Sequence, residues 1–278
     1  IVDKPSYYPE RERKSYLFRL FDNFLLILKH MRINECYNFF GMDIKGSRQD
    51  YLGSRTFAKT RDRMHGLSKN KKVYNHSVTL INKYIFYCIL KSLNMPTPRC
   101  FAVSIKGSML YLSGVTEITD IFNSRRIFAK PLESYGADGI VCLKNKEELM
   151  NLQKQWRKEN YLLQEEIIQH PEMNKLYAGS VNTIRIVTFY YNNDDVRFSS
   201  AFLRCGTKTG GAVDNLSKGG YGIGINEDGT LRKYAYNEPM HGGFKIENHP
   251  DSGMVFLGFK IPFYLEAVEL AKNLHRYL

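Results

Sequence analysis

The sequence predicts an α+β protein with two lobes that meet near residues 164–172, preceded by a helical N-terminal extension. Short segments whose side chains alternate as in β-strands lie on both sides of this junction. Segments with helical periodicity separate them and occupy both ends of the chain. The 278 residues are enough for two to three subdomains around a shared core. We expect the extension in residues 1–75, a small lobe in 76–165 and a large lobe in 166–278.

Composition and charge describe a globular protein with anionic partners. Hydrophobic residues make up 43% and charged residues 24% of the chain, which are ordinary values. The net charge of +12 indicates a nucleotide, a phosphorylated substrate, nucleic acid or an acidic membrane surface. No apolar run reaches the ~18 residues of a transmembrane helix. The five cysteines are scattered without a CxxC pair, which argues against a disulfide framework or zinc site and fits a reducing cytoplasm.

Residues 6–40 have the periodicity of a basic amphipathic helix. Apolar residues recur at helical spacing between Leu17 and Leu28, with arginines and lysines among them. Such a helix either lies on a membrane surface or a lipid-linked substrate, or packs on the main domain with its basic side in solvent. Residues 41–75 are polar and basic, and we expect a loop-rich linker with short helices there.

The small lobe is predicted to place a lysine beside a glycine-containing loop. Lys130 ends a strand, and Gly136 and Gly139 follow it. Glycines let backbone N–H groups approach phosphate oxygens, and a lysine adds a point charge. An ordinary β-hairpin with a lysine at its base has the same pattern, and no P-loop motif is present. The other elements expected in this lobe are a helix over 77–93 with Lys83 in its first half, a helix over 146–158, and strands at 99–105, 109–112, 126–130, 140–143 and 161–164.

Two strands of the large lobe, 183–191 and 196–204, are predicted to pair as a hairpin, because the residues between them favour a turn. With Phe189 opposite Phe198, Arg185 and Arg204 lie on one face, roughly 7–8 Å apart at the backbone. Two neighbouring guanidinium groups either share an anion or are salt-bridged separately at the surface. The sequence alone leaves both possibilities open.

A glycine-rich segment follows this hairpin and contains Asp214, Asn215, Gly219 and Gly220. A second hairpin is expected from 220–225 to 231–236, with a turn at 226–229. A loop then leads into a last helix over 262–277, which has a proline in its first turn.

Acidic residues gather in the connection between the lobes. A carboxylate at Glu165 or Glu166 could accept a hydrogen bond from an adenine amino group, and the backbone of Ile168 could pair with the ring edge. Glu172, seven residues after Glu165, could bind two ribose hydroxyls. Without further context these residues are equally well ordinary surface acids.

The order of these motifs resembles the ATP-grasp superfamily, which includes D-alanine–D-alanine ligases and the glutamate ligases that modify ribosomal proteins. Glu165 and Glu172 reproduce the E-x-x-x-x-x-x-E spacing of the former, and 182–185 and 215–220 look like strand motifs of the latter. The sequence is most similar to the sugar-transfer-associated ATP-grasp proteins of polysaccharide gene clusters. That resemblance covers about residues 76–278 and rests on "FAKPLESYGADG", "EEIIQHPEMNKL", "SVNTIRIVT", "FLRCG", "AVDNLSKGGYGIGI" and "HPDSG…GFKIP".

The resemblance implies an ATP-grasp fold, in which Mg-ATP lies between two antiparallel sheets. It also implies a carboxylate–amine ligase: the γ-phosphoryl group transfers to a carboxylate, and an amine attacks the acyl phosphate. Positioning and charge neutralisation dominate such phosphoryl transfer. By this resemblance Lys83 and Lys130 hold the α- and β-phosphates, with Gly136 and Gly139 in the loop above them. Arg185 and Arg204 take the γ-phosphate and the tetrahedral intermediate, and Asn215 with the Gly219 and Gly220 amides holds the acyl end, with Asn182 and Asp214 nearby.

One part of the family pattern is missing. ATP-grasp enzymes bind magnesium through an Asp and a Glu-x-Asn on strands that follow a helix like 262–277, whereas this sequence stops at Leu278 and starts at Ile1 rather than at a methionine. No metal ligand is therefore assigned. We expect the natural protein to continue, and the large sheet to end at an open edge beside the final helix with Arg185 and Arg204 pointing into a cleft.

Three functions compete at this stage. The first is a cytoplasmic ligase of cell-surface polysaccharide synthesis that joins a small-molecule or sugar-linked carboxylate to an amine. The second is a catalytically incomplete nucleotide-binding module that acts in a glycan-synthesis complex. A nucleic-acid-binding protein is the third, suggested only by the net charge, and we expect no nucleic-acid partner because no RNA- or DNA-binding motif is present.

Overall fold

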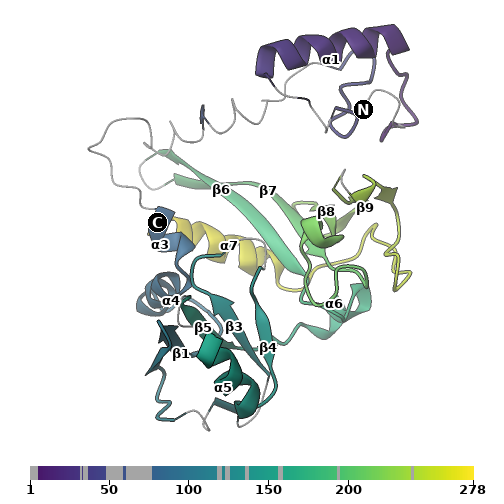
Figure 1. Cartoon of the computed structure of the whole chain (residues 1–278). Helices are drawn as coiled ribbons and strands as arrows, with labels where there is room; N and C mark the ends of the chain where they lie inside the picture. Colours follow the sequence, from purple (N-terminus) through teal and green to yellow (C-terminus); the bar gives the residue numbers. More distant parts are fainter. Residues whose placement is uncertain are drawn as a thin grey trace.

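The computed structural model describes residues 6–31, 33, 37–47, 59–60, 77–117, 121–122, 126–134, 138–155, 159–192, 195–238 and 241–278. It confirms a mixed α+β architecture with two antiparallel sheets of five strands each. The N-terminal helix α1 (Tyr16–His30) lies apart from both sheets (Figure 1). Gly136, which was predicted to lie in the phosphate-binding loop, is outside the described residues.

The first sheet has the strand order β2-β1-β5-β3-β4. One side packs on α5 (Lys146–Gln155), around buried residues such as Ile127, Leu143 and Leu149. A second cluster with Tyr87 from α4 (Lys83–Ser92) and Leu162 from β5 covers the other side. The strands are β1 (Cys100–Ile105), β2 (Ser108–Tyr111), β3 (Ile127–Pro131), β4 (Val141–Leu143) and β5 (Tyr161–Glu165).

The helix predicted over residues 77–93 is two helices, α3 (Ser77–Ile81) and α4 (Lys83–Ser92). Asn82 has an extended backbone (φ −76°, ψ 110°), and its side-chain oxygen accepts hydrogen bonds from the N–H groups of Tyr84 and Ile85. Asparagine caps a helix in this way and so starts a new one. Lys83 consequently stands at the first position of α4.

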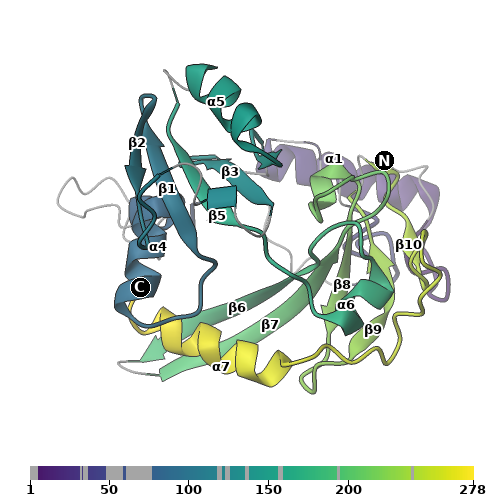
Figure 2. The same ribbon diagram turned by 90° about the horizontal axis from the view of Figure 1, so that it is seen from below.

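The second sheet has the order β10-β9-β8-β7-β6, so that β6 forms one edge of it. The last helix, α7 (Tyr264–His275), packs along β6 and β7 (Figure 2). The Thr188 hydroxyl lies 2.7 Å from Nδ1 of His275. The prediction of an edge beside the final helix is therefore confirmed for the described residues. The strands are β6 (Thr183–Asn192), β7 (Asp195–Cys205), β8 (Tyr221–Ile225), β9 (Leu231–Tyr236) and β10 (Lys245–Ile246).

The register of the β6–β7 hairpin is as predicted only near its base. Thr183 pairs with Arg204 and Arg185 with Phe202, but Phe189 pairs with Arg197 instead of Phe198. Between the pairs Val187–Ser200 and Thr188–Phe198, β7 has one extra residue, which is a β-bulge. The bulge turns Phe198 onto the side of the sheet that faces the core, where it packs against the buried cluster.

The core of the second sheet lies between the sheet, α7 and the short helix α6 (Pro171–Leu176). Ala201 and Leu203 of β7 are buried in it, and Ile184 and Ile186 of β6 pack against it. Because side chains alternate along a strand, Arg185 and Arg204 lie on the opposite face. One face of this sheet is thus used for packing, and the other carries the charged residues.

The N-terminal helix is shorter than predicted. Of the described residues between 6 and 40, Tyr16–His30 form α1, and residues 37–43 form turns. Ser15 caps the start of α1, and Met31 ends it in the left-handed conformation (φ 53°). Tyr7 and Phe39 from this segment contact the ring of Tyr236 on β9.

Candidate functional site

The two predicted lysines lie close together at the end of β3. The Lys83 ammonium donates to the backbone oxygens of Pro131 (2.7 Å) and Ser134 (3.1 Å). Lys130 donates to Oε1 of Gln164 at 2.7 Å. Burial lowers the pKa of Lys83, and burial together with repulsion from Lys83 lowers the pKa of Lys130. Neither ammonium has a carboxylate partner among the described residues.

This lysine pair fits a phosphate group. Two half-buried cations of like charge are unfavourable next to each other, and an anion between them would relieve that cost. Lys83 also fixes the loop after β3, because its ammonium is bonded to the backbone on either side of Glu133. Gly139 closes the loop with a φ of +74°, and a Cβ there would lie only 2.8 Å from Cγ of Pro131. Glycine is therefore needed at this position.

The predicted acidic residues of the connection have protein partners. Oε1 of Glu165 accepts from the backbone N–H of Arg99 at 2.7 Å, which ties the end of β5 to the start of β1. Glu166 pairs with Arg126 through both carboxylate oxygens. Ile168 is 64% exposed, and Glu172 lies in the first turn of α6, where its carboxylate pairs with Lys175. These contacts are all within the protein. The nucleoside contacts predicted for the same residues stay a prediction.

The two predicted arginines share a face but differ in environment. Arg204 forms an ion pair with Asp214 through two guanidinium nitrogens, and its Nε also donates to the Thr183 hydroxyl at 3.1 Å. Asp214 is buried and also accepts from the backbone N–H and the hydroxyl of Thr183. Arg185 is exposed, and no described residue forms a hydrogen bond or ion pair with it. Of the pair, Arg185 has the guanidinium that is available to an anion.

Several residues predicted to bind substrate are used within the protein. The buried Asn182 side chain donates to the Tyr177 carbonyl (2.9 Å) and accepts from the Gly206 N–H (3.1 Å). The amides of Gly219 and Gly220 donate to the carbonyls of Leu216 and Asn215, at 3.0 and 3.1 Å. In this structure both amides are thus bonded within the turn, and their predicted contact with an acyl group stays a prediction. Asn215 itself caps the 3₁₀ turn Leu216–Lys218.

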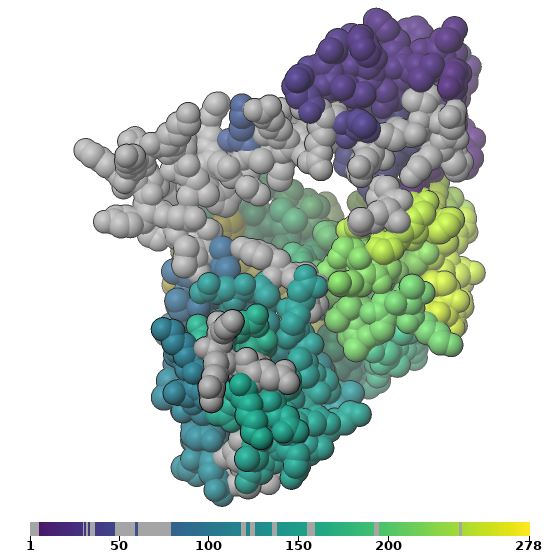
Figure 3. Space-filling model, viewed as in Figure 1, coloured from purple at the N-terminus to yellow at the C-terminus, as the bar shows by residue number. Residues whose placement is uncertain are grey.

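The turn at 216–218 folds back over the charged face of the second sheet. A Cβ on Gly222 would lie 3.3 Å from a methyl group of Leu216 and 3.7 Å from the ring of Phe202. Lys218 reaches Asp138 of the glycine-containing loop at 3.4 Å. The surfaces of the two lobes adjoin in Figure 3. The loop with its lysine pair and the 215–220 segment thus lie next to each other.

The structure adds one cation that the sequence reasoning missed. Arg232 on β9 passes over Gly224, where a Cβ would lie 2.9 Å from its Cδ. Gly224 pairs with Phe202, which pairs with Arg185, so both arginines lie on the same face of the sheet. Arg232 is exposed, and no described residue binds it. The glycines at 222 and 224 could have indicated this arrangement from the sequence. A strand without side chains on one face leaves room there for side chains from the adjacent strands.

Metal ligands do not gather in the described part of the chain. No group of three or more His, Cys, Asp or Glu residues there could hold an ion.

Comparison with known proteins agrees with this geometry. The family model for sugar-transfer associated ATP-grasp matches residues 63–278, which is most of the chain. Among curated proteins, the comparison finds no match. The family match includes both sheets, the lysine pair and the charged face with its arginines. The chain belongs to the sugar-transfer associated ATP-grasp family.

Proposed function

We propose that this chain is an ATP-dependent ligase that activates a carboxylate for attack by an amine during synthesis of cell-surface polysaccharide. The exposed guanidinium of Arg185 is the observation that carries the proposal. It lies on the face of the second sheet that is not used for packing, and no described residue neutralises it. Membership of the ATP-grasp family supports ATP as the anion.

Each lobe has a separate part in this proposal. The ammonium groups of Lys83 and Lys130 bind the α- and β-phosphates, which would stabilise their charged forms. Glu165, Ile168 and Glu172 in the connection bind the nucleoside. Arg185, with Arg232 farther along the same face, neutralises the phosphoryl group as it transfers. Arg204 is held by Asp214 and supports the position of its neighbours.

The proposed reaction has two steps. A carboxylate oxygen of the substrate attacks the γ-phosphorus, and the bond to the ADP oxygen breaks. The amine nitrogen then attacks the acyl carbon, phosphate leaves with the bonding electron pair, and the nitrogen loses a proton. Magnesium accompanies ATP in this fold generally, and we assign it no ligand here. The carboxylate is a small acid or a sugar-linked acid such as a uronic acid.

The test is turnover of Arg185→Ala, followed as ADP release with Mg-ATP, a uronic acid and an amine. We expect the rate to fall about a hundredfold or more with little change in ADP affinity, because the lost contact is to the transferring group. Arg197→Ala is the matched control. Arg197 is an exposed arginine near the tip of the same hairpin, bonded to Asp195, and its removal should leave the rate unchanged. Equal losses of rate and ADP affinity for Arg185→Ala would instead make this residue a ground-state binding group.

A nucleotide-binding module without ligase activity is the second candidate. It is favoured by the amides of Gly219 and Gly220 and by Arg204, which are bonded within the protein and not free for reacting groups. In that case Mg-ATP would raise the melting temperature, and no acid and amine pair would release ADP. ADP release that requires both an acid and an amine would rule this candidate out.

A further inference from the structure

Helix α1 turns its apolar side to solvent and its polar side to the protein. Asp22 and Asn23 are 7% and 8% exposed. The most exposed apolar side chains of the helix and its C-cap, each at least 57% exposed, are Leu17, Phe18, Phe21, Phe24, Leu28 and Met31. A helix that packs on a soluble domain normally has the reverse arrangement. Of the two arrangements expected for this helix, the one in which its apolar side packs on the main domain is therefore wrong.

Specific contacts fix this orientation. The buried Asp22 carboxylate accepts from the Lys14 ammonium at 2.6 Å and from the Tyr37 hydroxyl at 3.0 Å. Leu26, on the same side of the helix, packs with Tyr37 and Met42. Burial and the hydrogen bond to Asp22 raise the pKa of Tyr37, so its hydroxyl keeps its proton. Rotating the helix would break these contacts, so the outward direction of the apolar side belongs to the fold.

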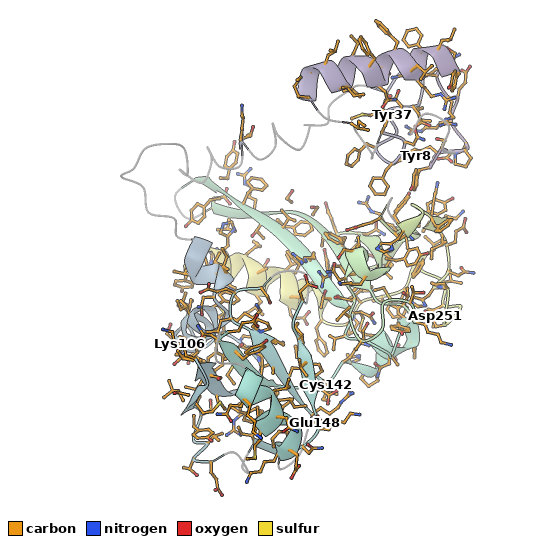
Figure 4. All side chains as sticks on the ribbon, viewed as in Figure 1. Tyr8, Tyr37, Lys106, Cys142, Glu148 and Asp251 are labelled. Carbon is orange, nitrogen blue, oxygen red and sulfur yellow. The ribbon has the colours of Figure 1, made fainter. Side chains whose placement is uncertain are left out.

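The helix is also attached to the second sheet. The ammonium of Lys245 on β10 donates to the backbone oxygen of Tyr7 at 2.8 Å, and Tyr7 and Phe39 pack on Tyr236. Figure 4 shows Tyr37 and Tyr8, which are not part of α1, between this helix and the sheets. On the opposite side of α1, side chains project away from the rest of the molecule. The apolar side of α1 is thus presented outward from a body that is joined to the candidate site.

Most of the net positive charge of the chain lies in its N-terminal part, which contains α1. Residues 1–76 contain 16 Lys and Arg against eight Asp and Glu, a net +8 of the chain's +12. On α1 itself, Lys29 is exposed and lies next to the apolar side, whereas the half-buried Arg19 lies on the side that faces the protein. Basic segments are drawn to anionic lipid, while two copies of such a segment repel each other.

The width of the apolar side also favours lipid over a second helix. At ~100° per residue, the exposed apolar positions from Tyr16 to Leu28 cover roughly 200° of the helix surface. A coiled-coil partner needs only the narrower seam of two positions per seven. With its 15 residues α1 is ~22 Å long, and among the described helices none has the length and apolarity to cross a bilayer.

We propose that α1 lies flat in the headgroup region of an anionic phospholipid bilayer, with its apolar side inserted, and holds the second sheet at the membrane surface. The aromatic rings of Phe18, Phe21 and Phe24 enter the boundary between headgroups and acyl chains, and the ammonium of Lys29 beside them contacts lipid phosphates. This proposal does not depend on the proposed ligase reaction.

The test is co-sedimentation of the full chain with vesicles, without nucleotide. Vesicles of phosphatidylcholine with about a third of phosphatidylglycerol should carry the protein down, and vesicles of phosphatidylcholine alone should carry down much less. Phe21→Ser/Phe24→Ser should weaken binding to the anionic vesicles at least tenfold. Leu257→Ser, at a side chain that is 61% exposed elsewhere in the chain, should leave binding unchanged.

Three results would overturn the proposal. These are no sedimentation of the unchanged protein, equal loss of binding in both variants, or a self-associated form in sedimentation velocity that Phe21→Ser/Phe24→Ser dissociates. The last result would assign the surface to a second copy of the chain. Circular dichroism and the shift in melting temperature with Mg-ATP show whether the variants are folded. A failed ligase assay would leave the vesicle result standing, so the two proposals fail separately.

Discussion

Removing the carboxylate of Asp214 should destabilise the second sheet by about 3 kcal/mol. This carboxylate accepts from two nitrogens of Arg204 and from the N–H and hydroxyl of Thr183. The side chains of Arg204 and Asp214 are only 19% and 7% exposed. Asp214→Ala therefore leaves a mostly buried guanidinium without its counter-charge. Such a truncation costs ~3–5 kcal/mol, and the residual exposure of Arg204 puts this case at the lower end.

A double-mutant cycle separates the pair from its surroundings. Arg204→Met should cost about 1.5 kcal/mol, because Asp214 keeps both hydrogen bonds from Thr183. The double variant removes both charges and should cost about 3 kcal/mol, which is less than the sum of the single changes. The expected coupling free energy is therefore about 1.5 kcal/mol.

The assay must report on the second sheet itself. Hydrogen exchange by mass spectrometry along a urea series gives the local free energy of opening for peptides from β6 and β7. Peptides from the first sheet serve as the internal control and should not change. A coupling free energy below about 0.5 kcal/mol would refute the reasoning, because Arg204 would then be free to bind a phosphoryl group as Arg185 is proposed to do.

Three further predictions concern single side chains. Burial lowers the pKa of Lys130 below 10.5, so the unfolded chain binds this proton more tightly than the folded protein does. Urea unfolding at several pH values should therefore show that the free energy of unfolding rises with pH up to about 10.5, and that it rises less in Lys130→Met. The same variant should bind ATP ~1.5–3 kcal/mol more weakly by calorimetry. Gly220→Ala should destabilise the fold by about 2–3 kcal/mol in thermal unfolding, since its Cβ would lie 2.6 Å from the Asp214 carbonyl oxygen and no flexible side chain can yield. Burial raises the pKa values of Cys100 and Cys205 to about 12, so near pH 8 a thiol reagent followed by peptide mapping should modify exposed Cys88 and spare these two until the protein unfolds.

The strand register shows how far alternation can be read from sequence. Alternation placed Arg185 opposite Phe202 and Thr183 opposite Arg204, and both pairs are confirmed. It failed beyond Val187, because a β-bulge adds one residue to β7 and reverses which side Phe198 faces. No local pattern marks the bulge, since it is the core around α7 that selects Phe198.

Arg185 and Arg204 were predicted from the sequence to lie on the charged face of the second sheet, but their contacts were not predicted. Sequence periodicity showed that two arginines share this face, but not which of them has a protein partner. That partner, Asp214, lies ten residues after Arg204, and the turn at residues 208–212 brings the chain back to it. Lys83 is a comparable case, because its contacts with the loop after β3 join residues 48 to 51 positions apart.

Helix α1 shows a different limit of sequence reasoning. Its hydrophobic periodicity correctly indicates that the apolar residues share one side. Periodicity does not say what that side faces, because the same pattern serves a helix on a protein core and a helix on lipid. The answer comes from Tyr37 and Lys14, which bind Asp22 on the polar side and so decide which way the helix is turned.

The two sheets have separate hydrophobic cores, and this affects how the protein should melt. The clusters around Leu163 and around Leu203 share no residue. Among the described residues, the chain segment 166–170 and the ion pair of Asp138 and Lys218 join the sheets, and an exposed ion pair of this kind contributes less than about 1 kcal/mol. With so little coupling, each sheet should lose its structure at its own temperature, giving two calorimetric transitions. A compound that binds both sheets would add its binding free energy to their coupling, so the number of transitions, two or one, would itself report whether a ligand bridges them.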